Sequence, residues 1–210
     1  MNIVLMGCPG AGKGTQSAKL KERFNLTHIS TGDVLRAEIA SVSVLGKQVA
    51  EIINQGNLIP DMLMISILEK IVKATDQGII FDGFPRTVAQ AQALQNMLRG
   101  LHREITHVVM IDLPEGEVVS RICGRRLCKK CGAVVHVDPN APLAACPSCG
   151  GELYTRADDT PERAKHRLEV YKNDTLPIKT YYQNSGKYTE VNGAQTPDQV
   201  FEDLVKILTK

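Results

Sequence analysis

The chain has 210 residues, 43% of them hydrophobic, which is enough to fill the core of one large domain or of one domain with insertions. Its 25 Lys and Arg residues and 23 Asp and Glu residues leave a net charge of +2, so bulk charge gives no reason to expect binding to nucleic acid or to an acidic membrane. No apolar run approaches the roughly 20 residues that span a bilayer, and the first run stops at Gly7 without a secretory signal pattern. We expect a cytoplasmic protein, and nothing demands more than a monomer.

Hydrophobic periodicity predicts alternating strands and helices. Short buried strands are expected over residues 2–6, 78–82, 106–113 and 187–191. Helices are expected over residues 13–24, 87–98, 114–122 and 196–208. Pro114 suits a first helical turn, and Thr196, Pro197 and Gln199 form an N-cap, a first position and a capping box. This alternation predicts an α/β fold with a central, mostly parallel sheet covered on both faces.

Two segments interrupt the alternation. Residues 30–59 are helical in pattern without an intervening strand, and residues 124–159 carry two cysteine pairs and a proline-rich stretch. We interpret both as excursions from the sheet domain. The predicted core is therefore made of residues 1–29, 60–123 and 160–210.

A glycine-rich stretch, "GCPGAGKGT", joins the first strand to the first helix. Gly7, Gly12 and Lys13 fit the spacing G-x-x-x-x-G-K, in which backbone N–H groups and a helix N-terminus surround a phosphate and the lysine reaches its outer oxygens. An ordinary glycine-rich turn would be the simpler interpretation. Gly14 stands where most such loops have a metal-binding hydroxyl, and Thr15 follows one place later. A magnesium ion would therefore be held largely by phosphates and water.

Several motifs resemble one enzyme family. The displaced hydroxyl in "GKGT" is similar to nucleoside monophosphate kinases, and "ISTGDVLR" (29–36), "FDGFPRT" (81–87) and "NGAQ" (192–195) resemble adenylate kinases along essentially the whole chain. The resemblance implies a three-layer P-loop nucleoside monophosphate kinase fold with two mobile excursions. It also implies reversible phosphoryl transfer from ATP to AMP, giving two ADP, with Mg²⁺ bound to ATP. Segment 30–59 would bind the monophosphate, and 124–159 would be the zinc-bearing lid of a long form.

Phosphoryl transfer between two nucleotides needs charge stabilisation rather than a general base, because the attacking oxygen is already anionic. Arginines that converge from separate segments suit this task, since a guanidinium can fork onto phosphate oxygens. The candidates that lie in matching motifs are Arg36, Arg86, Arg125, Arg156 and Arg167. Three arginines outside these motifs are expected to be surface charges, namely Arg103, Arg126 and Arg163.

The resemblance assigns a role to each candidate. Arg36 and Arg86 would bind the monophosphate, Lys13 and Arg125 the triphosphate, and Arg156 and Arg167 the transferring group; of these, the catalytic set is Lys13, Arg86, Arg125, Arg156 and Arg167. ATP contacts are expected at Gly10, Ala11, Gly12, Lys13, Gly14, Thr15, Arg125, Val134, Val135 and Gln195. AMP contacts are expected at Thr31, Arg36, Asn57, Leu58, Ile59, Gly83, Phe84, Pro85, Arg86, Gln90, Arg156 and Arg167. Gln90 would read the adenine edge, although it also fits a polar helix face.

Carboxylates complete the predicted site. Asp82 ends an apolar strand, where open α/β sheets place ligands, and we assign it to magnesium through water. Asp33, Asp158 and Asp159 are candidates for the same neighbourhood, and Asp159 fits a helix N-cap equally well. No histidine is given a catalytic role.

Four cysteines form two Cys-x-x-Cys pairs, at Cys128, Cys131, Cys146 and Cys149. Their spacing predicts a tetrahedral, structural four-thiolate site, most simply for zinc, although iron also binds four thiolates. The same spacing is compatible with two disulfides or with thiols that bind nothing.

Three further functions share part of this pattern. The same chemistry could use GTP as donor or UMP or CMP as acceptor. A regulatory nucleotide switch would need its hydroxyl directly after Lys13, and a nucleic-acid-binding zinc ribbon would need basic or aromatic residues over 132–145, which contain neither. We therefore expect ATP, AMP and ADP as partners, without nucleic acid or membrane.

Overall fold

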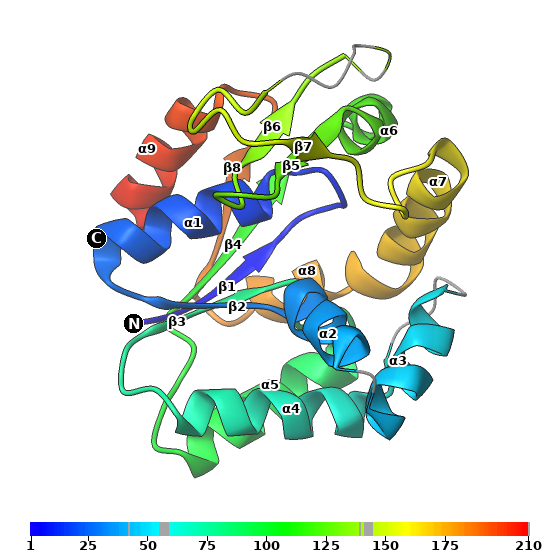
Figure 1. The fold of residues 1–210 in the computed structure, drawn as a ribbon. Helices are drawn as coiled ribbons and strands as arrows, with labels where there is room; N and C mark the ends of the chain where they lie inside the picture. Colours follow the sequence, from blue (N-terminus) through cyan, green and yellow to red (C-terminus); the bar gives the residue numbers. More distant parts are fainter. Residues whose placement is uncertain (42, 55–58, 139, 141–144, 210) are drawn as a thin grey trace.

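The protein is built around a five-stranded parallel sheet (Figure 1). The computed structural model describes residues 1–209 except 42, 55–58, 139 and 141–144. In spatial order the strands are β2 (Thr27–Ser30), β3 (Ile79–Asp82), β1 (Asn2–Met6), β4 (His107–Asp112) and β8 (Tyr188–Asn192). The predicted α/β class with a parallel sheet is confirmed.

Helices cover both faces of this sheet (Figure 1). One face carries α2 (Thr31–Ala40), α3 (Val44–Asn54), α4 (Asp61–Lys73), α5 (Val88–Gly100) and α8 (Ile178–Gln183). The other carries α1 (Lys13–Phe24), α6 (Glu115–Cys123), α7 (Pro161–Val170) and α9 (Pro197–Leu208). A π-helical turn, Tyr171–Thr175, joins α7 to the segment before α8.

The alternation of side chains along the central strand explains why the protein has a buried cluster on each face of the sheet. In β1, Ile3 and Leu5 pack into one buried cluster, and Val4 and Met6 pack into the other. Successive strand residues point to opposite faces, so a strand that is apolar at every position can only lie between two layers of helices. The unbroken apolar run at the start of the chain therefore specifies a three-layer architecture.

Parallel pairing brings the carboxyl ends of the strands to one edge of the sheet. Leu5 pairs with Asp82, and Ser30 on the neighbouring strand pairs with the same residue. The segments that leave β1, β2 and β3 at this edge contain the glycine-rich loop, the start of α2 and the loop before α5. Three motifs far apart in sequence are thus placed side by side.

Each predicted strand and helix has a counterpart in the structure, and further elements were not predicted. The helix over 13–24 has its predicted bounds, and Thr196 and Gln199 form the capping box before α9. Strand β2, helices α4 and α8 and the strands within 124–159 were not predicted. β2 is a four-residue edge strand with only Ile29 fully buried, so its hydrophobic pattern is weak. Pro114 is the N-cap of α6, one residue before its predicted place.

A second, antiparallel sheet lies within the predicted excursion 124–159. Its spatial order is β6 (Val134–His136), β5 (Arg125–Cys128) and β7 (Leu153–Tyr154). Its small core contains Cys128, Cys146 and Leu153. Where the excursion leaves α6, the Val137 N–H donates to the Gly124 carbonyl at 3.0 Å, so the end of β6 lies beside the start of the excursion. Among the described helices, none has both the length and the apolar character needed to cross a bilayer.

Candidate active site

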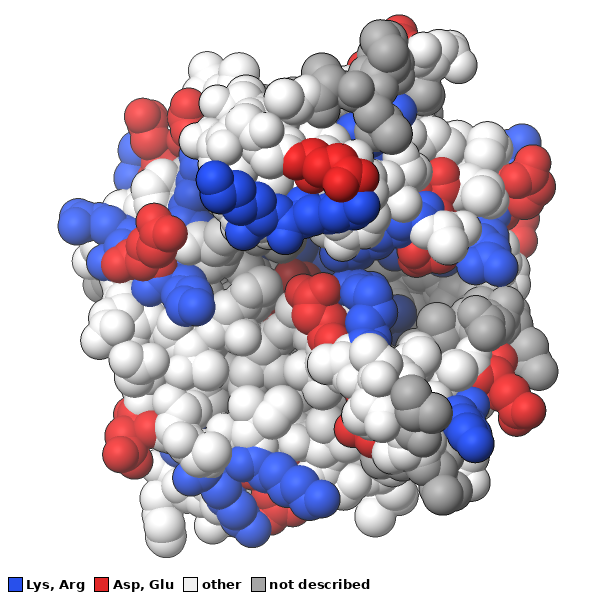
Figure 2. All heavy atoms as spheres, in the orientation of Figure 1, with Lys and Arg blue, Asp and Glu red and all other residues white. Residues whose placement is uncertain are grey.

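A cavity of about 610 Å³ lies at the carboxyl edge of the large sheet. Its walls come from the glycine-rich loop, α2, the loop before α5, the small antiparallel sheet and α7. Figure 2 shows basic side chains gathered around the hollow between α2 and the small sheet, with acidic groups among them. The cavity is lined by the predicted lysine and by all five predicted arginines: Lys13, Arg36, Arg86, Arg125, Arg156 and Arg167.

The glycine-rich loop has the backbone of an anion-binding turn. Gly10 and Gly12 have φ angles of 84° and 91°, in the left-handed region that favours glycine, and Gly12 is the N-cap of α1. The Lys13 ammonium folds back over the loop and donates to the carbonyl oxygens of Gly7 at 2.8 Å and Cys8 at 3.0 Å. The Lys13 N–H groups that donate to these carbonyls are the same groups that could donate to a bound phosphate. Burial lowers the pKa of Lys13, and the negative charge of Asp82 opposes this shift.

The loop before α5 positions a second cation. Arg86 Nε donates to the Gly83 carbonyl at 2.8 Å, and the residue stays exposed at the cavity. The buried Thr31 hydroxyl donates to the same carbonyl at 3.0 Å and so joins α2 to this loop. Gly83 has a φ of 80°, which bends the chain so that its carbonyl accepts from both directions.

Carboxylates hold the remaining arginines in pairs. Arg125 Nε donates to Asp159 Oδ2 at 2.8 Å and its Nη2 to Asp159 Oδ1, with the Asp159 side chain fully buried. Arg167 Nη1 lies 3.3 Å from Asp158 Oδ2 and 3.7 Å from Asp159 Oδ1. These pairs keep the guanidinium groups ordered and directed at the cavity.

The third acidic residue bridges two segments. Asp33 pairs with Arg36 on its own helix, and its Oδ1 lies 3.7 Å from Arg156 Nη2. Burial lowers the pKa of Arg156, and the positive charges of Arg125 and Arg36 lower it further. The cations therefore repel one another, and an added polyanion would relieve that repulsion.

Two sequence interpretations in this region are wrong. Asp159 is not the N-cap of α7, because Thr160 accepts from the Arg163 N–H and Asp159 is buried against Arg125. Arg126 is not a surface charge, since it is only 5% exposed and its Nη1 donates to the carbonyls of Cys123 at 2.9 Å and Arg125 at 3.1 Å. Arg163 is exposed as expected. Burial of Arg126 depends on the packing of the excursion, which local sequence does not reveal.

Arg103 is only partly a surface charge. It is half-buried, and its Nη2 donates to the Gln77 carbonyl. The guanidinium thereby ties the turn after α5 to the segment that leads into β3.

Half of the other predicted nucleotide contacts that the structure describes line the cavity, and half do not. Among the predicted nucleotide contacts, the cavity lining also includes Gly10, Gly12, Gly14, Thr15, Gly83, Pro85 and Val134. Those that the structure describes but that do not line it are Ala11, Thr31, Ile59, Phe84, Gln90, Val135 and Gln195. Asn57 and Leu58 lie outside the described residues. The Gln195 amide instead donates to Asp203 Oδ2 at 3.3 Å.

Sequence reasoning missed Arg121 and the histidine beside Asp82. Arg121 lines the cavity, pairs with Glu117 at 2.8 Å and donates from Nη1 to the Gly193 carbonyl at 3.0 Å. Its place in the last turn of α6, directly before the segment that carries Arg125, was the available signal. His28 also lines the cavity, with Nε2 lying 3.2 Å from Asp82 Oδ2.

Asp82 suits the predicted role beside a magnesium ion. Its side chain is 11% exposed and lines the cavity. A methyl group placed on Gly14 would lie 3.7 Å from its Oδ2, so the carboxylate faces the start of α1. One carboxylate oxygen close to a phosphate loop fits Mg²⁺, which keeps several waters and takes few protein ligands.

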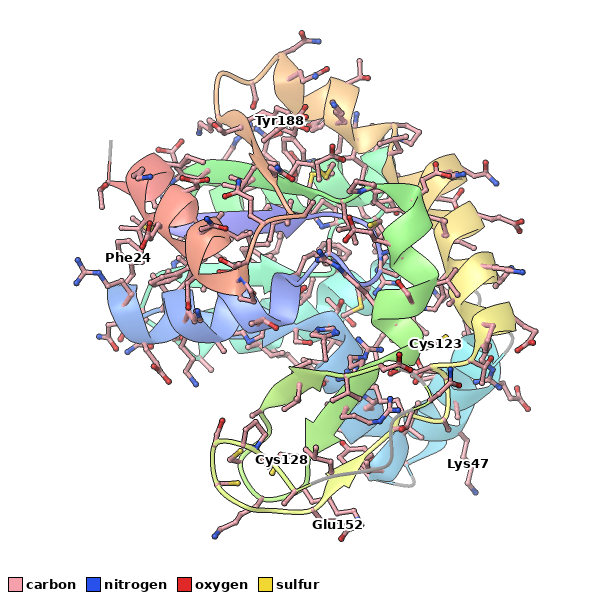
Figure 3. The ribbon with its side chains drawn as sticks, turned by 90° about the horizontal axis from the view of Figure 1, so that it is seen from above. Phe24, Lys47, Cys123, Cys128, Glu152 and Tyr188 are labelled. Carbon is pink, nitrogen blue, oxygen red and sulfur yellow. The ribbon has the colours of Figure 1, made fainter. Side chains whose placement is uncertain are left out.

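The four predicted cysteines come together at the far end of the small sheet, where Figure 3 labels Cys128. Their sulfur atoms all lie within 4.8 Å of one another, with Cys128 Sγ 3.4 Å from Cys149 Sγ and Cys131 Sγ 3.8 Å from Cys146 Sγ. A disulfide needs about 2.05 Å, so these are four free thiols. Around a metal with bonds of about 2.3 Å, tetrahedral sulfurs lie about 3.8 Å apart.

Backbone donors also favour a thiolate in this cluster. The N–H groups of Cys131 and Lys130 lower the pKa of the Cys128 thiol. The Gly151 N–H acts in the same direction on the Cys149 thiol, but hydrogen bonds with the Cys131 and Cys128 sulfurs outweigh it and raise the pKa of that thiol. Thiolates are the form that binds metal. Four sulfur ligands leave no open coordination position, so the cluster suits a structural ion.

Comparison with known proteins identifies relatives over the full length. The family model described as "Adenylate kinase" matches residues 5–187. An adenylate kinase of Geobacillus sp. (strain WCH70) is 45% identical over 212 residues, which cover 99% of this chain and 98% of the relative. Adenylate kinases of Desulfitobacterium hafniense (strain DSM 10664 / DCB-2) and Oceanobacillus iheyensis are 46% and 44% identical, covering 98% and 100% of this chain and 96% and 100% of the relatives.

Proposed function

The chain belongs to the adenylate kinase family, and we infer from this premise that it transfers the terminal phosphoryl group of ATP to AMP, reversibly, to give two ADP. One observation supports this most strongly. A lysine and five arginines from separate segments surround a single cavity at the edge of the sheet where the phosphate loop lies. Such a site stabilises two polyanions placed end to end.

We propose the following division of labour. The loop N–H groups, Lys13 and Arg125 hold the phosphates of ATP, and Arg36 and Arg86 hold the phosphate of AMP. Arg156 and Arg167, which come from the segment after the small sheet and from α7, stabilise the charge on the transferring group. The proposal is supported by the position of all six side chains on the cavity wall.

Carboxylate partners hold the arginine side chains of the site in place before nucleotides bind. Asp33, Asp158 and Asp159 occupy the guanidinium groups of Arg36, Arg167 and Arg125. We propose that nucleotide phosphates take over these donors, so the arginines need little reorganisation. A preorganised charge array is what makes such a site effective in the transition state.

Adenylate kinases use Mg²⁺ with ATP, and we propose that Asp82 holds this ion through water. When bound, the ion supplies positive charge to the phosphate oxygens. His28 Nε2 lies 3.2 Å from Asp82 Oδ2, the oxygen that faces the start of α1, and so helps to orient this carboxylate at the loop.

We propose that residues 124–159 close over ATP and residues 30–59 over AMP, and that closure excludes water as a competing acceptor. Support comes from the separate small core of the first segment and from Arg36 and Arg156, one from each segment, which both line the cavity. A cytoplasmic monomer that uses neither nucleic acid nor membrane stays a prediction, and sedimentation velocity tests its monomeric state.

The activity is tested by following diphosphate formation from ATP and Mg²⁺ with each nucleoside monophosphate in turn. We expect AMP to be the best acceptor and ATP the best donor. Faster reaction with UMP or CMP, or with GTP as donor, would support those substrates instead. Hydrolysis of ATP at the same rate without any monophosphate would contradict phosphotransfer.

The cysteine cluster makes a separate prediction. Cys149→Ser is expected to lower metal affinity about tenfold or more and to lower the melting temperature, with a smaller effect on turnover at low temperature. The physical reason is that the ion stabilises the small sheet, whereas the reacting groups come from other segments. Zinc content, thermal melting with and without chelator, and kcat measured in the cold check this.

Cys123→Ser is the matched control, because Cys123 is half-buried outside the cluster. Its zinc content should equal that of the unchanged protein. A Cys149→Ser protein that keeps its metal but loses as much activity as a protein without the Lys13 ammonium would overturn the structural role.

A further inference from the structure

The Gln90 side-chain amide is held at both ends. Its Oε1 accepts from the Arg86 backbone N–H at 2.7 Å, and its Nε2 donates to Asp61 Oδ1 at 2.7 Å. The residue is 3% exposed, in the first turn of α5. Its partner is the first residue of α4, twenty-nine positions earlier in the chain. The contact therefore joins the start of α4 to the loop that carries Arg86.

The two partners together select one orientation of the amide. The oxygen and nitrogen ends of a glutamine have nearly the same shape, so only their partners decide which way the amide points. A carboxylate accepts and a backbone N–H donates, and neither can do the reverse. If the amide were reversed, its nitrogen would face the Arg86 N–H and its oxygen would face Asp61. The reversed orientation leaves both ends of the buried Gln90 amide facing groups with which they cannot pair.

One donor and one acceptor of the amide remain after these two bonds. Nε2 has a second hydrogen and Oε1 a second lone pair. Adenine presents an amino donor next to a ring acceptor, whereas hypoxanthine presents a carbonyl acceptor next to a ring N–H donor. An amide fixed in one orientation can pair with either adenine or hypoxanthine, but not with both. An amide that is free to reverse can pair with both bases.

We propose that Asp61 is a specificity-determining positioning residue, which fixes the Gln90 amide in the orientation that pairs with adenine and disfavours a 6-oxopurine. This inference rests on the proposed function and on the expectation from the sequence that Gln90, which lies outside the cavity lining, reads the adenine of AMP. Asp61 acts through Gln90 and does not touch the reacting atoms. Because Gln90 also accepts from the Arg86 N–H, the same contact keeps the base-reading group in register with a phosphate-binding arginine.

A purely structural role has to be distinguished from this one. Asp61 lies in the first turn of α4, where a negative charge stabilises the helix dipole. Asp198 lies in the first turn of α9 and follows a proline in the same way, and its side chain pairs with Lys19 on α1. Asp198→Ala thus removes an equivalent helix-terminal charge away from the cavity.

The test compares Asp61→Ala, Asp61→Asn and Asp198→Ala by kcat/KM for AMP and for IMP with saturating ATP and Mg²⁺. In Asp61→Ala, loss of one orienting hydrogen bond should lower the AMP-to-IMP ratio about tenfold, mainly through KM. Asp61→Asn keeps an acceptor oxygen and should restore the ratio to within about threefold of the unchanged protein. Asp198→Ala should keep the ratio.

Each outcome decides the matter. If Asp61→Ala raises KM equally for AMP and IMP, or if Asp61→Asn loses as much selectivity as Asp61→Ala, the positioning role is wrong and the residue acts through helix charge or stability. Should Gln90→Ala keep full selectivity, the reading of the base by Gln90 fails and this inference fails with it. An unchanged protein that does not phosphorylate AMP would instead contradict the proposed function itself.

Discussion

Replacing Lys13 with methionine is expected to lower kcat about a thousandfold. The ammonium is half-buried at the glycine-rich loop. Removal of a preorganised donor for developing charge costs about 10²–10³ in rate, and loss of a full charge lies at the upper end. Methionine keeps the length of the side chain approximately and removes the charge and its hydrogen bonds. The fold should persist, because the desolvation that lowers the pKa of Lys13 disappears with the charge. Single-turnover kinetics and thermal melting measure the two effects separately.

The matched control is Lys19→Met on the same helix. Lys19 pairs with Asp198 and lies 5.4 Å from the Phe201 ring, away from the cavity. The Lys19→Met protein should retain kcat within about twofold, since exposed ion pairs contribute little to stability. If both lysine variants kept comparable activity, the phosphate loop would have no part in the reaction.

Replacing Arg167 with methionine is expected to lower kcat about a hundredfold or more, with a smaller change in KM for either nucleotide. Arg167 lies at the cavity, and Asp158 and Asp159 hold its guanidinium between α7 and the small sheet. An arginine that stabilises the transferring group acts in the transition state, so kcat carries its effect. Arg167→Lys should recover only part of the rate, because an ammonium does not fork onto two phosphate oxygens.

Arg163→Met provides the comparison for this variant. Arg163 lies four residues earlier on the same helix and is exposed. Initial rates at saturating ATP and AMP should separate the two variants by at least about fiftyfold. Equal rates would show that the charge of α7 as a whole, rather than the position of one guanidinium, supports the reaction.

Elements that depend on neighbouring residues were predictable from the sequence. The helix over 13–24, the capping box at Thr196 and the phosphate loop have their predicted places, since each follows from local backbone preferences. The convergence of the arginines was predictable because their motifs resemble those of a known family, and the cysteine cluster because ligand spacing is itself local.

Burial and partner choice were not predictable in the same way. Arg126 and Arg163 have the same side chain, yet the first is buried at the base of the small sheet and the second is exposed. Strand β2 is held by pairing with β3, whose residues lie about fifty positions later, and its own pattern is weak. Such contacts join distant segments, and a window of sequence contains no information about them.

The sequence by itself determined the chemistry available to this protein: a glycine-rich loop with the spacing of a phosphate loop, a set of arginines and a cluster of four cysteines. Only the tertiary structure decided which carboxylate holds each arginine, that Arg121 joins the cavity and that Asp61 holds the Gln90 amide. The reason is physical. Residue type sets what a side chain can donate, accept or neutralise, whereas its partner and its burial follow from the packing of a sheet whose strands come from distant parts of the chain.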